Sequence, residues 1–328
     1  AVTALEAVVG PGASERVVAE LELAETLRRA GQAAEAVALA TGAIRALEQR
    51  GAEPSAEYAQ AIYVAGRARV AAGEVDEGIA LLERAVERSR ELHGDYGMPT
   101  LDAKNGLANA LEVRNDLERA EALLRDVLSA VQVIFGEDHQ EAGIVLGNLA
   151  NVLSERPEHF AEAEAAYLRS AEILRARLGP MSPETATQVQ NLGALLLKTQ
   201  EWSRAEAAFR ESLAIRNRVL GPDHPDVATN KLGLALAVNK LERYEEARGL
   251  LAESIASLEA SLGASHWRTA NVRRYLGTVL TNLGRYDEAA AALRQARVDL
   301  VAAFGEEHPR VQSADQALAE LDAARGAG

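Results

Sequence analysis

Four of the six histidines recur at regular spacing, and histidine is a side chain that can bind metals or transfer protons. His139, His224, His266 and His308 are separated by steps of 85, 42 and 42 residues. Positions one repeat apart are too distant to share a metal, because zinc ligands all lie about 2 Å from the ion. We therefore favour capping or packing at helix starts over metal binding or catalysis.

The chain carries none of the short motifs that mark common enzyme and nucleotide sites. GxGxxG, Walker, GxSxG, HExxH and calcium-loop patterns are absent. Glu245 and Glu246 are adjacent, so on a helix they point in different directions and do not form a carboxylate pair. Cysteine is absent, which excludes a thiolate nucleophile and a cysteine zinc site. The sequence thus predicts no enzyme, no metal site and no cofactor.

Asparagines form the most informative polar pattern. Asn105 and Asn109 are four residues apart and Asn148 and Asn151 are three apart, so each pair shares one face of a helix. Asn191 occupies the matching position one repeat later. Asparagine offers donors and an acceptor, so a row of them can pair with the backbone of an extended partner. The alternative is that these side chains join adjacent helices or contact solvent.

The elements that would position these side chains repeat along the chain. Glycine recurs in steps of 42 or 43 residues, with Ala52 at the one missing position. Two columns of small residues, one starting at Ala24 and one at Ala36, follow the same period. A fixed period of this length indicates stacked repeats that contact only their neighbours. The recurring glycines are residues 10, 94, 136, 179, 221, 263 and 305.

Between these glycines the apolar residues follow helical spacing in two successive stretches, as in 227–241 and 244–262. Prolines fall between helices or in first turns, where a missing N–H costs little. The recurring glycines follow each second helix, where we expect a left-handed cap. The pattern predicts seven helical hairpins, over residues 14–49, 54–93, 97–135, 139–178, 182–220, 224–262 and 266–304.

The two ends are expected to differ. Residues 307–328 predict one further helix without a partner, whose polar positions suit a solvent-facing cap. Residues 1–13 are interpreted as the tail of a preceding, truncated repeat, so we expect an upstream part before Ala1.

Composition narrows the classes of partner. A net charge of −14 argues against nucleic-acid binding, which needs clustered lysine and arginine. No run of 18 or more apolar residues and no signal-peptide pattern is present. We therefore expect no nucleic-acid partner, no membrane insertion and a cytoplasmic location.

The spacing of small and bulky residues resembles that of the tetratricopeptide repeat. The resemblance is carried by Leu276, Gly277, Leu280, Tyr286, Ala289, Leu293 and Ala296. The 42-residue period, with LGPDHPDVA at 220–228 and LGRYDEA at 283–289, is similar to the kinesin-light-chain subtype, which also occurs in bacterial multidomain proteins. The resemblance implies an all-α fold, a right-handed α-solenoid of about seven hairpins with a C-terminal capping helix.

It further implies that the first helices line a concave groove that binds a protein or an extended peptide segment. The implied function is a non-catalytic scaffold, the regulatory or partner-recruiting part of a larger protein such as a Ser/Thr kinase or a signalling ATPase. The alternative is a structural, oligomerisation or intramolecular sensor segment, which leaves a homo-oligomer open. The candidate groove residues are Arg67, Asn105, Asn109, Asn148, Asn151, Asn191, Lys198, Arg274 and Asn282.

Overall fold

The computed structural model describes residues 14–326, and within them every regular element is a helix. The chain divides into two compact units, Ala1–His159 and Phe160–Gly328, which are described separately. The all-α fold predicted from the sequence is confirmed, and each unit consists of stacked antiparallel helices of the α-solenoid kind. The tail expected over residues 1–13 lies outside the described residues.

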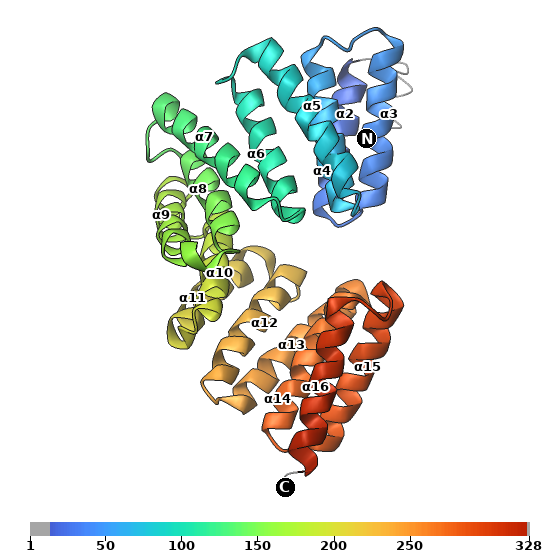
Figure 1. Cartoon of the computed structure of the whole chain (residues 1–328), viewed down its shortest axis with the longest axis vertical. Helices are drawn as coiled ribbons and strands as arrows, with labels where there is room; N and C mark the ends of the chain where they lie inside the picture. Colours follow the sequence, from blue (N-terminus) through green and yellow to red (C-terminus); the bar gives the residue numbers. More distant parts are fainter. Residues whose placement is uncertain (1–13, 327–328) are drawn as a thin grey trace. The chain divides into compact units, whose positions relative to one another are not determined.

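Unit 1 holds three consecutive helix pairs and the first helix of a fourth (Figure 1). Successive helices pack on each other, and each first helix also packs on the first helix of the next pair: α2 on α4, α4 on α6 and α6 on α8. The helices are α2 (Ser14–Arg29), α3 (Ala33–Gln49), α4 (Ala56–Ala71), α5 (Val75–His93), α6 (Met98–Val113), α7 (Leu117–Phe135) and α8 (Gln140–Leu153), followed by the short 3₁₀-helix η1 (Pro157–His159).

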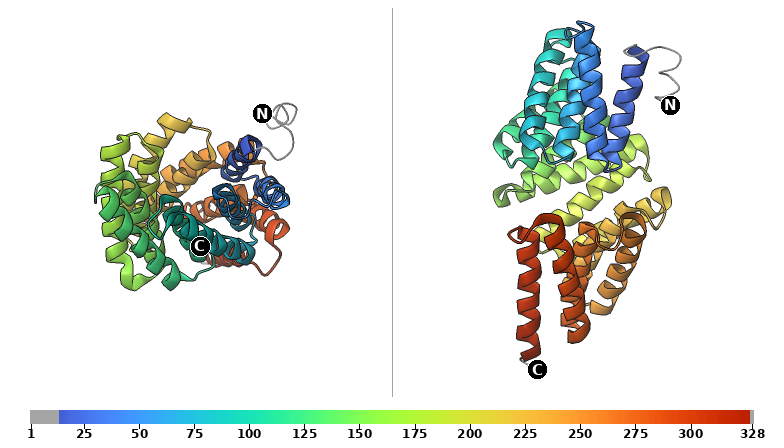
Figure 2. Two further views of the ribbon diagram at one scale, coloured as in Figure 1. Left: turned by 90° about the horizontal axis from the view of Figure 1, so that it is seen from above. Right: turned by 90° about the vertical axis from the view of Figure 1, so that its right-hand side faces the viewer.

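Unit 2 continues the same alternation and ends in a single helix. Its helices are α9 (Phe160–Leu178), α10 (Pro183–Lys198), α11 (Trp202–Leu220), α12 (Pro225–Lys240), α13 (Tyr244–Leu262), α14 (Trp267–Asn282), α15 (Tyr286–Phe304) and α16 (Pro309–Gly326). Helix α16, red in Figure 2, packs on α14 and α15 through Val311, Ala314, Ala317 and Leu321. The polar residues Asp315, Gln316 and Glu320 on its other faces are exposed.

Small residues let the two helices of each pair approach closely. A Cβ atom added at Gly277 on α14 would lie 2.4 Å from Leu293 Cγ on α15, and one added at Gly66 on α4 would lie 2.8 Å from Leu82 Cγ on α5. Ala108 and Ala150, at the same repeat position, are fully buried. The leucine of each second helix therefore fills the space that a larger first-helix residue would need.

The turns after α2, α4, α6, α10, α12 and α14 contain a residue with positive φ, and three of them use residues other than glycine. The turn after α8 forms η1 instead. After α4, Gly73 N–H donates to Val70 O at 3.1 Å and Glu74 N–H donates to Arg69 O at 2.9 Å, which is a Schellman motif. The equivalent positions Asn115, Gln200 and Glu242 have φ values of 66°, 63° and 61°. A side chain in this region is strained, so these turns are held by the hydrogen bonds around them.

The recurring glycines between pairs adopt a different conformation from the one predicted. Gly94 has φ 74° and ψ 174°, and Gly263 has φ 97° and ψ 157°, so φ is positive but ψ is extended. This region is essentially restricted to glycine, because the Cβ atom of any other residue would clash with the backbone. It sends the chain out of the second helix into the loop. A left-handed helical cap appears instead at Gly51, φ 65°, beside Ala52 at the missing position of the series.

Ion pairs connect the exposed sides of second helices in neighbouring repeats. In unit 1, Arg119 on α7 contacts Glu83 on α5 at 2.8 Å. In unit 2, Arg243, which precedes α13, contacts Glu206 on α11 at 2.7 Å. Much of the charge on the second helices therefore joins adjacent repeats at the protein surface.

Candidate functional site

The four regularly spaced histidines cap the starts of first helices. His224 Nδ1 accepts a hydrogen bond from the Asp226 backbone N–H at 3.1 Å, and His266 Nδ1 accepts one from Arg268 N–H at 3.2 Å. His139 and His308 make the same contact. A ring nitrogen accepts only when it carries no proton, so the caps require neutral imidazole. The predicted capping role is confirmed.

These histidines also pack against aromatic rings or lie in partly buried sites. The His139 ring stacks on Phe135 with centroids 4.7 Å apart, and His308 stacks on Phe304 at 4.3 Å. Burial and the nearby Arg268 guanidinium lower the pKa of His266, which favours the neutral form that its cap needs. Within residues 14–326 no group of three or more His, Asp or Glu side chains is arranged to hold a metal ion.

A groove of unit 1 with a volume of about 870 Å³ is lined by the first helices α2, α4 and α6 and by Ser89 and His93 near the end of α5. Val18 and Leu21 of α2 and Val64 of α4 supply apolar surface. Val18 is 46% exposed. The groove therefore offers apolar contact area that no described residue covers completely.

Glu25 holds the arginines at one end of this groove. Arg28 contacts both carboxylate oxygens at 2.8 and 2.9 Å, Arg29 contacts Oε1 at 3.1 Å, and Arg67 contacts it at 3.4 Å. Burial by itself would raise the pKa of Glu25, but the Arg28 hydrogen bond and the Arg67 charge lower it to about 2. Arg67 also donates to the Tyr63 hydroxyl at 3.2 Å. Arg67, which the sequence analysis named as a candidate, thus lines the groove with its guanidinium bound to Glu25 and Tyr63.

The carboxylates at the other end of the groove, at the starts of α4 and α6, have no such partner, and neither has Glu22 in the middle of α2. Glu57 lies in the first turn of α4 and Asp102 in the second turn of α6, and Glu22 lies on α2. None of the three has an arginine or lysine at ion-pair distance within residues 14–326. Partial desolvation and the charge of Glu141 on α8 raise the pKa of Asp102, and the charge of Arg67 opposes the shift. This end of the groove is therefore electronegative.

The asparagines predicted in unit 1 lie outside the lining of this groove, on α6 and on α8. Asn148 Nδ2 on α8 donates to Asn105 Oδ1 on α6 at 2.9 Å, so these two amides join adjacent first helices. Asn109 and Asn151 are half-buried on α6 and α8, and Asn109 Oδ1 is buried without a hydrogen-bond partner. The bond uses one donor and one acceptor, so Asn105 Nδ2 and Asn148 Oδ1 keep hydrogen-bonding capacity for a ligand.

The remaining candidates belong to unit 2. Asn191 is half-buried in the middle of α10, and Lys198 is exposed at its last position. On α14, Asn282 Nδ2 donates to Asn239 Oδ1 of α12 at 3.1 Å, and Arg274 donates to Asn271 Oδ1 at 3.3 Å. The Arg274 guanidinium lies 3.9 Å from the centroid of the Tyr275 ring. Amide contacts between adjacent first helices therefore occur in both units.

Sequence reasoning missed Tyr63, Glu25 and Asp102. A signal for two of them was present, because Asp102 lies three residues before Asn105 and Tyr63 lies four before Arg67, on the same helix faces. Glu25 gave no such signal, since its role depends on Arg67 of another helix.

Trp267 is packed at the start of α14. Its ring lies edge-on to Phe304 with centroids 5.8 Å apart, and the Arg310 guanidinium lies 4.6 Å from its centroid. The tryptophan thereby joins α14 to α15 and α16, which is a structural role.

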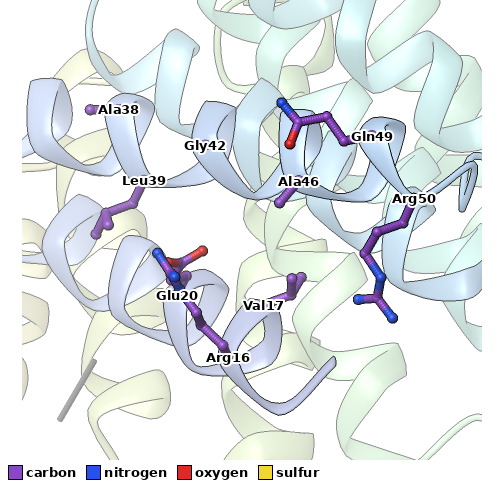
Figure 3. A pocket seen from close by; sticks show the side chains of 9 residues that line it. All are labelled: Arg16, Val17, Glu20, Ala38, Leu39, Gly42, Ala46, Gln49 and Arg50. Atoms are coloured by element: carbon purple, nitrogen blue, oxygen red, sulfur yellow. The ribbon is translucent and has the colours of Figure 1, made fainter. Parts of the chain in front are cut away.

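A smaller hollow of about 240 Å³ lies between α2 and α3 (Figure 3). Arg16 and Glu20 project into it from α2 and pair with each other at 2.8 Å. The α3 side consists of small residues such as Ala38, Gly42 and Ala46. Because its acidic group is already paired and its volume is small, the groove on α2, α4 and α6 is the better candidate site.

None of the helices within residues 14–326 has both the length and the apolar character needed to cross a bilayer.

Comparison with known proteins places these features in context. Models of the tetratricopeptide repeat match residues 63–132, 99–176, 184–260 and 229–297. No curated protein matches the chain.

Several solved structures share the fold. One is a signal transduction ATPase with numerous domains and a tetratricopeptide repeat sensor from Pyrococcus horikoshii, with TM-score 0.66 and 15% identity over 99% of this chain and 46% of that one. A Rap protein complexed with competence and sporulation factor has TM-score 0.63 and 15% identity over 94% of this chain and 80% of that one. BtubC (BKLC) from P. vanneervenii has TM-score 0.56 and 18% identity over 75% of this chain and 92% of that one.

Proposed function

Because the chain belongs to the tetratricopeptide repeat family, we propose that it is a non-catalytic scaffold that binds peptide or protein segments on its first helices. The observation that carries the proposal is the groove of about 870 Å³ on α2, α4 and α6. A groove of this size accommodates several side chains of a partner. Preformed helical repeats also lose little conformational entropy on binding, which favours flexible partners.

The asparagines, which lie beside this groove and not in its lining, would extend the proposed recognition along α6 and α8. Asn105 and Asn148 support each other through their hydrogen bond, which orients both amides. An extended segment has unpaired backbone N–H and C=O groups, and amide side chains can pair with both kinds. In unit 2, Asn191, Lys198, Arg274 and Asn282 would act in the same way on α10 and α14.

A regulatory or partner-recruiting role in a larger protein, such as a kinase or signalling ATPase, is the finer part of the proposal. The structural likeness to a tetratricopeptide repeat sensor of a signal transduction ATPase supports it at the level of the fold. The Rap structure, solved with competence and sporulation factor, is a second neighbour of the same fold that holds a named partner.

Selection of peptides from a random display library tests the binding role. We expect the full chain to enrich a family of peptides, and the triple substitution Asn105→Ala, Asn148→Ala and Asn191→Ala to weaken their binding. The control is Asn217→Ala, because Asn217 is an exposed residue of the second helix α11. Equal binding by the wild type and the triple variant would refute the role of the asparagines.

Oligomerisation is the second candidate function, and one exposed surface favours it. Val133, Ile134 and Phe135 end α7 and are 84%, 45% and 41% exposed. Exposed apolar side chains gathered at one helix end are typical of contact sites. Size-exclusion chromatography with light scattering tests for self-association. We expect a dimer in the wild type and a weaker dimer in Val133→Ser.

A further inference from the structure

The charges of the groove in unit 1 are separated along the first helices. Arg29 ends α2 and Arg67 lies towards the end of α4, whereas Glu57 lies in the first turn of α4 and Asp102 in the second turn of α6. Both arginines contact Glu25. The positive end is therefore engaged within the protein, while the negative end keeps its charge for a ligand.

The negative end carries like charges on neighbouring first helices. Asp102 is an exposed residue of α6, and partial desolvation of its carboxyl together with repulsion from Glu141 on α8 raises its pKa, whereas the Arg67 charge lowers it. No lysine or arginine among residues 14–326 lies at ion-pair distance from Asp102. A cationic group bound beside Asp102 would remove this repulsion, so the carboxylates favour a positively charged ligand over a neutral one.

Apolar contact area adjoins these carboxylates. Val18 on α2 is 46% exposed. The Tyr63 ring packs on the α6 backbone at Gly106, where an added Cβ would lie only 2.7 Å from Tyr63 Cε2. Glycine at this position lets the ring lie flat between α4 and α6, so that Tyr63 forms part of the groove surface. A ligand that reaches Asp102 therefore also meets aliphatic and aromatic surface.

We propose that this groove, given the scaffold function proposed above, selects an extended basic segment whose lysine or arginine side chain pairs with Asp102 and whose neighbouring aliphatic side chain packs on Val18 and Tyr63. Three first helices packed about 10 Å apart span about 20 Å between their axes. An extended segment of about nine residues is about 30 Å long, which is sufficient to cross them.

Fluorescence anisotropy with the full chain and two labelled peptides tests this inference. One peptide of about nine residues alternates lysine and leucine, and its twin has glutamate in place of every lysine. We expect the lysine peptide to bind, the glutamate twin to bind at least tenfold more weakly, and Asp102→Asn to weaken the lysine peptide about three- to tenfold. Val18→Ser should also weaken it, because the leucine contact is reduced.

The matched control is Glu87→Gln on α5, an exposed carboxylate that does not line the groove. It changes the net charge by the same amount as Asp102→Asn, so it should change the affinity less than about twofold if location matters rather than total charge. Equal weakening by the two variants, or preference for the glutamate twin, overturns the basic-segment inference while the scaffold function stands. If the display selection yields no peptide that binds the full chain, the scaffold function itself is overturned.

Discussion

The side-chain amide of Asn148 on α8 donates a hydrogen bond of 2.9 Å to Asn105 Oδ1 on α6, across 43 residues of sequence. The bond joins the first helices of two consecutive repeats, and both side chains are half-buried. The same two residues are therefore candidates for ligand binding and contributors to stacking. Stability and binding measurements on one set of variants separate these roles.

The Asn105–Asn148 pair predicts an energetic coupling. Asn148→Ala removes a partly buried hydrogen bond and should lower the free energy of unfolding by about 0.5–1.5 kcal/mol. The double variant with Asn105→Ala should cost less than the sum of the two single changes, because the shared bond is lost only once. Urea unfolding of the four proteins measures the coupling, and strictly additive losses would show that the bond does not contribute.

Glu25 predicts an acid-dependent loss of stability. Its pKa is lowered from 4.5 to about 2 in the folded chain. The ionised carboxylate therefore stabilises the fold above about pH 4.5, and this contribution is lost as the pH falls towards 2. Glu25→Gln should lower stability at pH 6 by on the order of 1–2 kcal/mol after allowance for solvent screening.

The difference between wild type and Glu25→Gln should shrink as the pH is lowered through this range. Urea unfolding at a series of pH values measures whether the stability difference between the two proteins shrinks as the pH falls. A difference that stays constant with pH would mean that the arginine contacts of Glu25 do not stabilise the ionised form.

For Asp102 we expect the opposite effect of ionisation on stability. Burial and Glu141 raise its pKa, so the protonated form is favoured in the folded chain and the charged form costs stability at neutral pH. Asp102→Asn should therefore raise the melting temperature at pH 7. The gain should diminish as the pH falls and the wild-type carboxyl takes up its proton. Glu87→Gln is the control, and a lower melting temperature for Asp102→Asn would contradict the assignment.

The strained turns predict stabilising substitutions. Glu242 has φ 61° at a position where Gly73 and Gly284 have φ 88° and 73°. Glu242→Gly should raise the free energy of unfolding by about 1 kcal/mol, because a side chain in the left-handed region costs about that much. The reciprocal change Gly284→Ala should destabilise by a similar amount. Thermal unfolding measures both, and destabilisation by Glu242→Gly would show that the turn is not strained.

The small-residue column predicts an overpacking effect. An added Cβ at Gly277 would lie 2.4 Å from Leu293 Cγ, whereas one at Gly249 meets no atom within 4 Å. Gly277→Ala should therefore lower stability by about 1–3 kcal/mol through displacement of the leucine. Gly249→Ala, the control, should raise stability by up to about 1 kcal/mol, since alanine is the better helix former. Hydrogen exchange should show faster opening of α14 and α15 only for the first change.

The capping histidines and the glycines show where prediction succeeded and where it stopped. The spacing of His224 and His266 located them at helix starts, because a fixed repeat places equivalent residues in equivalent turns. Positive φ at Gly94 was also predictable from its place after a second helix, but its extended ψ was not, since that angle depends on the direction in which the loop leaves.

The candidate groove residues show a similar division. The helix faces of Asn105 and Asn148 followed from intervals of three and four residues, yet their mutual hydrogen bond required the spacing between two helices. The sequence identified Arg67 as a candidate groove residue. It did not predict that the Arg67 guanidinium contacts Glu25 and the Tyr63 hydroxyl.

The sequence by itself determined that this protein is a series of helical pairs, because helix formation and capping act over three or four residues and repeat with the chain. Only the tertiary structure decided which groove charges are paired, since Arg67 contacts Glu25 whereas no lysine or arginine of residues 14–326 lies at ion-pair distance from Asp102. The physical reason is that these partners lie on neighbouring first helices. Their distances depend on how closely the small residues let the helices pack, and no local pattern encodes that separation.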